Sequence, residues 1–183
     1  MILPTDTRYA LGCLASDPEA ARALRAAKGR DDAQPLPLVV GDVEQLGALC
    51  GPLPDVARTL AARFWPGPLS LVLSAAAAVS DAITSGGGTV AVRVPAHDFL
   101  RRLCLRVGPL VSTSANRSGR PAPQSCAEAL AEVGQFVALA VDGGFGNALP
   151  STIVDVTGSE PKLRRAGPIA WPEIAAALRM GPA

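Results

Sequence analysis

Short apolar runs alternate along this chain with longer amphipathic stretches, and this alternation limits the fold more than any other feature. Residues 90–94 and 110–113 have the apolar, partly β-branched composition of buried strands. Elsewhere, Val56, Leu60 and Phe64 recur every four residues, which is typical of one face of a helix. Strands that alternate with helices are characteristic of α/β domains. The sequence therefore predicts an α/β fold.

Capping and turn residues set the expected ends of these elements. Residues 18–28 are predicted to form a helix that Ser16 and Glu19 open as a capping box and that Gly29 ends. The other expected helices are 42–49, 55–64, 98–107, 125–133 and 172–179. A loop at 35–40 leads into a strand, and the other expected strands are 69–73, 89–94, 110–113, 136–141, 152–156 and 163–165.

Length and composition are those of one globular domain. The 183 residues are 49% hydrophobic but only 4% aromatic, so we expect a single domain over 1–183 with a core of Ala, Leu and Val. A net charge of +1 argues against a strongly basic nucleic-acid binder, although it leaves room for a local basic patch. No apolar run reaches the length of a membrane span, and the start does not have the pattern of a signal peptide. We therefore expect a cytoplasmic protein that does not contact a membrane.

The cysteine and histidine content excludes several kinds of site. Cys13, Cys50, Cys104 and Cys126 are widely spaced and form no C-x-x-C pair, so they do not make a zinc pattern. We expect free thiols that are buried. His97 is the single histidine, which excludes any site that needs two, and entry into a helix is its simpler role. No structural metal held by the protein is expected.

Residues that could bind anions stand at the expected ends of helices and strands. Lys28 and Arg30 follow a predicted helix, and 112–116 is a Ser/Thr/Asn loop after a predicted strand. Lys28 is one of two lysines in a chain with fifteen arginines. Cations beside hydroxyl groups can hold phosphate or carboxylate, while a solvated helix end is the alternative interpretation. Arg93 lies in an apolar run, where a buried cation needs a partner, and it could also form an ion pair at a sheet edge.

Further candidates at expected strand ends are Thr5, Thr7, Ser151 and Arg165, each of which could equally be structural. The chain has no Walker A motif, no G-x-G-x-x-G and no paired carboxylates at catalytic spacing. The catalytic strategies that remain are positioning of the substrates and neutralisation of developing charge. These are the main means of catalysing phosphoryl and nucleotidyl transfer.

Eight short motifs follow one another through most of the chain. They are PTDTRYALG at 4–12, KGR at 28–30, FWPGPLSL at 64–71, VAVRVP at 90–95, STSANRSG at 112–119, DGG at 142–144, PSTIVD at 150–155 and RAG at 165–167. In this order they resemble the YrdC/TsaC threonylcarbamoyl-AMP synthase family. The resemblance implies a YrdC-like fold, which is a single domain with a twisted, largely mixed open sheet flanked by helices.

The resemblance also implies a nucleotidyltransferase reaction. L-threonine, bicarbonate and ATP would give threonylcarbamoyl-AMP and pyrophosphate, with Mg²⁺ accompanying ATP. The product would feed N6-threonylcarbamoylation of adenosine 37 in tRNA through separate tRNA threonylcarbamoyl-transferase proteins. The implied catalytic residues are Lys28 and Arg30. The implied L-threonine site is Thr7, Arg93, Ser112 and Ser151, and the implied ATP site is Lys28, Arg30, Gln34, Thr89, Ser114, Asn116 and Arg165.

The chain departs from the family pattern at several positions. Arg8 replaces a usual Val, Ala10 replaces a usual Gly, and Val39 stands where many members have a His. The chain begins three residues before Pro4, so we expect the family's first helix and most of its first strand to be missing, with 2–3 as the remainder of that strand.

Two alternatives to the synthase stay open. The first is an RNA-binding module, which the low charge and few aromatic residues weaken, although weak tRNA binding remains an expectation. The second is a nucleotide-binding paralog similar to YciO and without synthase activity, which residues 9–13 also resemble. The S-x-N pattern of Ser114 and Asn116 favours the synthase.

Overall fold

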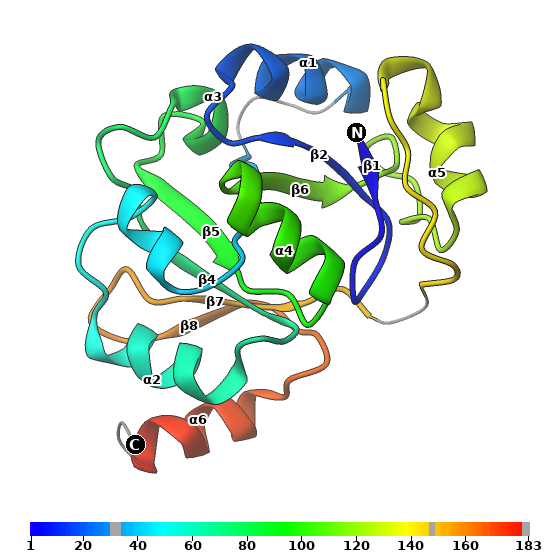
Figure 1. The fold of residues 1–183 in the computed structure, drawn as a ribbon. Helices are drawn as coiled ribbons and strands as arrows, with labels where there is room; N and C mark the ends of the chain where they lie inside the picture. Colours follow the sequence, from blue (N-terminus) through cyan, green and yellow to red (C-terminus); the bar gives the residue numbers. More distant parts are fainter. Residues whose placement is uncertain (30–33, 147–148, 181–183) are drawn as a thin grey trace.

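A single mixed sheet forms the centre of the protein and helices surround it (Figure 1). The computed structural model describes residues 1–29, 34–146 and 149–180. In that part of the chain the sheet has the order β1-β2-β6-β3-β5-β4-β7-β8. The strands are β1 (Ile2–Leu3), β2 (Ala10–Leu14), β3 (Leu38–Val39), β4 (Leu69–Ser74), β5 (Thr89–Arg93), β6 (Leu110–Ser114), β7 (Thr152–Asp155) and β8 (Lys162–Arg165). The predicted mixed α/β fold is confirmed.

Most neighbouring strands run antiparallel. The exceptions are β3 with β5 and β4 with β7, which pair in parallel. The helices are α1 (Pro18–Lys28), α2 (Asp55–Phe64), α3 (Asp81–Thr84), α4 (Asp98–Val107), α5 (Cys126–Val133) and α6 (Trp171–Met180), with 3-10 turns η1 (Glu44–Ala48) and η2 (Gly134–Phe136). None of the helices in the described ranges is long and apolar enough to cross a membrane.

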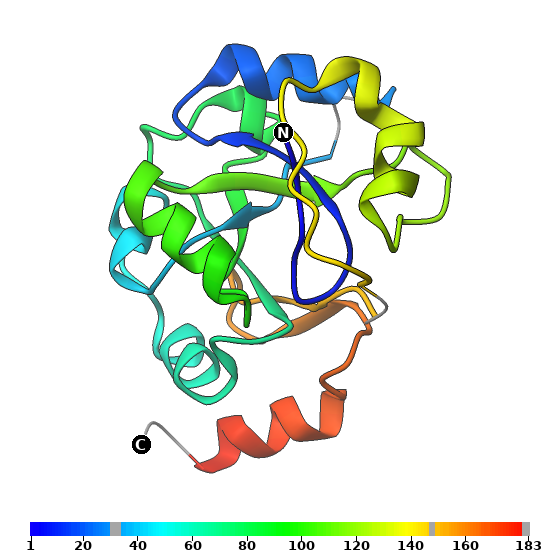
Figure 2. The same cartoon turned by 45° about the vertical axis from the view of Figure 1, so that its right-hand side comes forward.

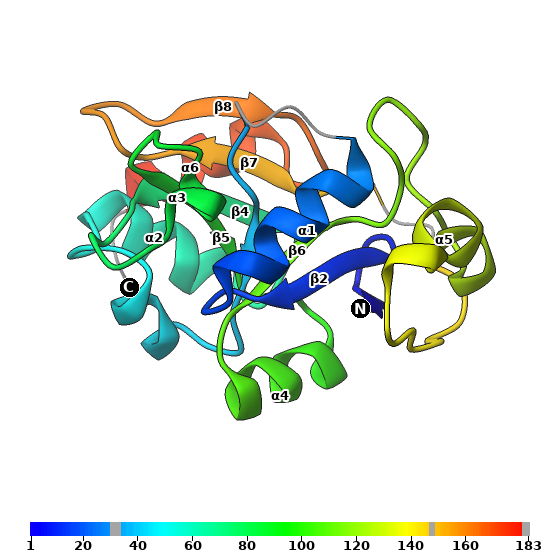
Figure 3. The same cartoon turned by 90° about the horizontal axis from the view of Figure 1, so that it is seen from above.

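The helices lie on different sides of the sheet. α1 packs on β2 and α3, whereas α2 packs on α6 at the opposite end of the molecule (Figures 1 and 2). Seen from above, α4 and β8 lie on opposite sides of the protein (Figure 3). Residues from seven of the strands, β2 to β8, line the cavity that the next section describes.

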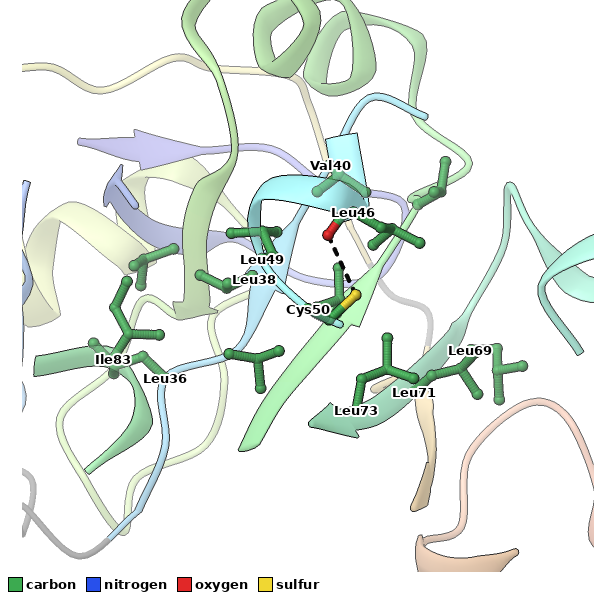
Figure 4. Close-up of a cluster of buried hydrophobic side chains, with 14 of the residues drawn as sticks. Leu36, Leu38, Val40, Leu46, Leu49, Cys50, Leu69, Leu71, Leu73 and Ile83 are labelled. Carbon is green, nitrogen blue, oxygen red and sulfur yellow. Dashed lines mark hydrogen bonds between the residues drawn. The ribbon is translucent and has the colours of Figure 1, made fainter. Parts of the chain in front are cut away.

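The core is built from aliphatic side chains, as the composition predicts. Leu38 of β3 and the leucines of β4 belong to one cluster with Leu46 of η1, and Leu46, Leu71 and Cys50 are buried there (Figure 4). The Sγ of Cys50 donates to the carbonyl oxygen of Leu46 at 3.2 Å. All four cysteines are free thiols, as predicted; Cys50, Cys104 and Cys126 are buried, but Cys13 is only half-buried, so the predicted burial is wrong for Cys13.

Helix ends follow capping chemistry, with one correction. Asp17, and not Ser16, caps α1, because its side chain accepts the N–H of Ala20 at 2.9 Å. Gly29 ends α1 with a left-handed φ of 58°, as predicted. His97 caps α4 by accepting the N–H of Leu100, which confirms its role in helix entry.

The predicted strand at 136–141 is wrong. Its first residue ends η2, and only Ala140 forms an isolated bridge to Ile2. The backbone N–H of Ile2 donates to Leu139 at 2.8 Å, and that of Val141 donates to Ile2 at 3.0 Å. Because β1 has only two residues, a strand that pairs with it can form only a short ladder. The segment does lie beside β1, but its pairing with β1 is limited to the isolated bridge between Ala140 and Ile2.

Candidate functional site

A cavity of about 700 Å³ opens on one face of the sheet. Alternation along β5 contributes to it: Ala91 and Arg93 line the cavity, whereas Val90 and Val92, which alternate with them, are fully buried in the core. The cavity brings together most of the candidates from the sequence. They are Thr7, Lys28, Gln34, Arg93, Ser112, Ser114, Asn116, Ser151 and Arg165.

Two candidates are not part of this group. Thr89 does not line the cavity, since it lies at the opposite end of β5 from Arg93, about 13 Å away at strand spacing. Arg30 lies outside the described residues. The departures Ala10 and Val39 both line the cavity, so the methyl group of Ala10 is accommodated there.

Four polar side chains cross the sheet in a line, which we call the arginine row: Arg93 on β5, Ser70 on β4, Ser151 beside β7 and Arg165 on β8. The Oγ atoms of Ser70 and Ser151 are 2.9 Å apart. Arg165 donates from Nε to the Ser151 carbonyl at 3.0 Å and from Nη2 to the Ser151 Oγ at 3.1 Å. Partial burial and the neighbouring Arg93 charge lower the pKa of Arg165 from its ordinary value. Arg93 and Arg165 line the same cavity, and two cations placed in this way favour an anion between them.

Asp6 fixes Arg93. Both Asp6 carboxylate oxygens accept from Nη1 of Arg93, at 2.8 and 2.9 Å, and the two side chains are 12% and 8% exposed. The backbone N–H of Ala96 also donates to Asp6, at 3.1 Å. The predicted buried cation therefore has a partner, and it lies in an interior strand instead of at a sheet edge. Asp6 contacts Nη1 alone, so the rest of the guanidinium fork can serve an anion.

The backbone at Gly167 lies close to the backbone at 150–152, which carries Ser151 of the arginine row. A Cβ at Gly167 would lie 2.4 Å from the nitrogen of Thr152 and 2.6 Å from the carbonyl oxygen of Pro150. The glycine of the RAG motif therefore lets the chain after β8 pack directly against the backbone that carries Ser151.

Lys28 holds the loop that follows β6. Its Nζ donates to the carbonyl oxygen of Ser114 and, at 2.7 Å, to that of Asn116. Its own carbonyl accepts the N–H of Ser118 at 2.9 Å. Lys28 is 4% exposed, so the interpretation as a solvated helix end is wrong.

Asn116 presents an acceptor without a partner. Its Nδ2 donates to the carbonyl oxygens of Arg117 and Arg120, at 2.8 and 2.7 Å. Its Oδ1 is buried and has no hydrogen-bond partner among the described residues, and Asn116 lines the cavity. An unpaired buried acceptor is costly, so this atom is suited to a ligand that donates, such as an amino group.

Sequence reasoning missed two supporting residues. Asp6 stands inside the 4–12 motif, which was the available signal. Arg25 is 5% exposed and donates to the carbonyl oxygens of Gln34 and Ala82, both at 2.9 Å. Its helical spacing from Ala21 and Lys28 places it on the buried face of α1 and could have indicated burial. It fixes Gln34 at the cavity wall.

The described lining of the cavity contains cations, hydroxyl groups and amides but no carboxylate. The described residues also contain no cluster of three His, Cys, Asp or Glu side chains that could hold a metal. The site is therefore suited to binding anions and to stabilising negative charge that develops during a reaction.

The fold and this site define an α/β protein with a cavity lined by cations, hydroxyl groups and amides. The family model Sua5_yciO_yrdC, described as telomere recombination, matches residues 1–167. The chain belongs to the Sua5/YciO/YrdC family, which confirms the resemblance seen in its motifs.

Named relatives cover almost the whole chain. A putative threonylcarbamoyl-AMP synthase of Mycobacterium tuberculosis (strain CDC 1551 / Oshkosh) is 39% identical over 97% of this chain and 82% of its own. The threonylcarbamoyl-AMP synthase of Pyrococcus abyssi (strain GE5 / Orsay) is 40% identical over 93% of this chain and 51% of its own. This chain thus spans about half the length of the Pyrococcus relative.

Solved structures agree with these relatives. P. abyssi Sua5 complexed with L-threonine has a TM-score of 0.92 and 38% identity, covering 98% of this chain and 53% of that one. E. coli YciO has a TM-score of 0.82 and 26% identity, covering 92% of this chain and 83% of that one. The YciO branch therefore shares the fold, at lower identity than Sua5.

Proposed function

We propose that this protein is a threonylcarbamoyl-AMP synthase, a nucleotidyltransferase that converts L-threonine, bicarbonate and ATP into threonylcarbamoyl-AMP and pyrophosphate. The observation that carries the proposal is one cavity that combines the arginine row with the unpaired Asn116 acceptor. A carboxylate and a nucleotide can bind there side by side. Relatives named for this product match nearly the whole chain.

The arginine row suits the amino acid. Arg93, oriented by Asp6, offers its remaining donors to the threonine carboxylate, and Arg165 adds a second positive charge. Thr7 and Ser151 line the same part of the cavity and supply hydroxyl groups for the polar end of the substrate. Ser112, on β6, completes the proposed amino-acid site.

The 114–120 loop suits the nucleotide. The Oδ1 of Asn116 can accept from the adenine amino group, while Ser114 and Gln34 line the wall nearby. Lys28 fixes this loop through two carbonyl oxygens and brings a positive charge to the cavity wall. That charge, with Arg30 and Arg165, would stabilise the triphosphate. Thr89 remains a proposed nucleotide contact. Since Thr89 does not line the cavity, ATP would have to extend beyond the cavity to reach it.

The reaction needs positioning more than acid–base chemistry. The threonine amine takes up carbon dioxide derived from bicarbonate and becomes a carbamate, with loss of a proton. A carbamate oxygen then attacks the α-phosphorus of ATP, and the bond to the bridging oxygen breaks as pyrophosphate leaves. Lys28 and the arginine row stabilise the charge that moves onto the phosphate oxygens.

Mg²⁺ enters as part of the substrate, MgATP. Magnesium keeps several waters and is commonly bound through substrate phosphates with few carboxylates. The described cavity lining, which has hydroxyls and amides but no carboxylate, fits an ion held mainly by phosphate oxygens and water. The product would pass to separate tRNA threonylcarbamoyl-transferase proteins, and weak tRNA binding is part of the same proposal.

The test is pyrophosphate release from MgATP with bicarbonate, with and without L-threonine. We expect release that depends on threonine and that serine does not replace. A protein that binds ATP but releases no pyrophosphate under these conditions would be a nucleotide-binding paralog of the YciO kind. Tight, salt-dependent tRNA binding without turnover would instead favour the RNA-binding module.

A further inference from the structure

Arg8 lines the main cavity and also a smaller side cavity of about 310 Å³ next to it. Ala122 and Pro150 line both cavities as well, so these three residues form the boundary between them. Gln124, Glu128 and Pro121 complete the side cavity. Arg8 is also the position at which the chain departs from the family's usual Val. The departure therefore places an additional positive charge at the boundary.

No described residue forms an ion pair with the Arg8 side chain. In the described part of the chain, the other cations of the cavity wall contact protein groups: Lys28 contacts two carbonyls, Arg93 contacts Asp6, and Arg165 contacts Ser151. The Arg8 side chain has no ion pair there, and its Nε is buried without a hydrogen-bond partner. A buried donor with no acceptor is unfavourable, so an anion beside it would be stabilising.

The backbone of Arg8 is nevertheless fixed. Its N–H donates to Thr5 Oγ1 at 3.1 Å, and its carbonyl accepts from the same hydroxyl at 2.6 Å. The next residue, Tyr9, is buried, and its N–H donates to Pro123 at 3.2 Å. The side chain therefore starts from a fixed backbone position and lines the side cavity together with Ala122 and Pro150.

This position matches one part of the proposed reaction. Arg8 stands between Thr7 and Ser151, at the proposed threonine site, and the loop that carries Asn116, at the proposed nucleotide site. The α-phosphorus must meet the carbamate between these two sites, so the β- and γ-phosphates must extend away from it. The side cavity beside Arg8 offers one such direction, and its described lining carries one cation, Arg8, and one carboxylate, Glu128.

We propose that Arg8 binds the pyrophosphate part of ATP, and the pyrophosphate that leaves, at the boundary with the side cavity. The assignment rests on the proposed function for the identity of the nucleotide. The carboxylate of Glu128 does not oppose it strongly, because Glu128 is exposed and its Oε2 accepts the N–H of Gln124 at 2.8 Å.

The experiment measures binding of magnesium pyrophosphate to the full chain by calorimetry. Arg8→Val restores the residue that the family motif has, and Arg8→Gln keeps most of the length without the charge. We expect both variants to bind pyrophosphate at least about tenfold more weakly, which is the size of one charge-assisted contact. Arg102→Val, an exposed arginine of α4, removes the same charge elsewhere and should leave the affinity unchanged.

The outcomes separate this assignment from the proposed function, because binding of pyrophosphate needs no turnover. Weaker binding in both Arg8 variants, with unchanged threonine affinity and melting temperature, supports the assignment even in a protein without synthase activity. Affinity within twofold of the wild type in a folded Arg8→Gln protein overturns it, even if the wild type is an active synthase. Absence of pyrophosphate binding to the wild type also overturns it.

Discussion

Two buried cations serve the same cavity in different ways. Arg93 is held by a carboxylate, Asp6, whereas Lys28 is held by two backbone carbonyls of the 114–120 loop. An ion pair fixes the direction of a guanidinium and compensates its charge, but it fails when either partner is removed. The two carbonyl contacts make the lysine the anchor of a loop. The threonine end of the cavity is thus held by paired charge, and the nucleotide end by a charge that positions backbone.

The largest effect should come from breaking the ion pair. Asp6→Asn would leave the Arg93 guanidinium buried without its carboxylate. We expect a loss of about 3 kcal/mol in the free energy of unfolding, at the lower end for such pairs, together with loss of threonine affinity. Urea unfolding at pH 7 measures the first effect and calorimetry the second.

The control for this variant is Asp55→Asn. Asp55 pairs with Arg58 at 2.8 Å, but the two side chains are 86% and 59% exposed. An exposed pair of this kind contributes little, so the control should unfold almost like the wild type. Equal stability of the two variants would mean that Asp6 does not compensate Arg93 in the way described.

Lys28→Met should have the next largest effect, because it removes the anchor of the 114–120 loop. We expect a loss of about 2 kcal/mol in the free energy of unfolding, as for hydrogen bonds to a charged group. ATP affinity should fall while threonine affinity stays near that of the wild type. Unfolding and separate binding titrations for the two substrates measure this split.

Lys162→Met is the matched control, since Lys162 is the other lysine of the chain and lies exposed on β8. It should change neither affinity. Parallel losses of ATP and threonine binding in Lys28→Met would contradict the division of the cavity into two differently held ends.

The two cations also show which features can be predicted from the sequence and which cannot. The helix at 55–64 was predicted with its observed ends, because amphipathic spacing and local turn residues set them. The strand at 136–141 failed, because a strand needs a partner that lies elsewhere in the chain. Lys28 and Arg93 were found as cations in motifs. Their partners, two carbonyls and Asp6, depend on tertiary contacts over more than 80 positions.

Ser151→Ala tests whether the serine in the arginine row contributes to threonine binding. The hydroxyl contacts Ser70 and accepts from Arg165, so its loss frees the Nη2 end of Arg165. We expect the KM for threonine to rise about fivefold, which corresponds to about 1 kcal/mol for one hydrogen bond. Because Arg165 also belongs to the proposed ATP site, the KM for ATP should rise as well, but by less than the KM for threonine. Ser159→Ala, at an exposed position, is the control, and an unchanged KM for threonine in Ser151→Ala would remove Ser151 from the proposed site.

The smallest expected effect concerns the support of Arg165 by the β7–β8 pair. Burial alone would raise the pKa of Asp155, but hydrogen bonds from Thr157 and Arg164 outweigh it and hold that pKa below its ordinary value of 3.8. Arg164 donates to Asp155 from Nη2 at 2.6 Å and from Nε at 3.0 Å. Since the pKa is lower in the folded state, the ionised carboxylate stabilises the protein above pH 3.8, and this contribution is lost as the pH falls through the folded-state pKa.

Asp155→Asn tests the expected direction of the pH dependence of stability. The wild type should be more stable than the variant at pH 7, and the difference in unfolding free energy should shrink progressively as the pH falls below 3.8. Urea unfolding of both proteins across that range measures it. A difference that stays constant with pH would show that Asp155 stabilises the strand pair through shape and not through charge. In that case the ion pair between Asp6 and Arg93 would be the principal charged support of the threonine end.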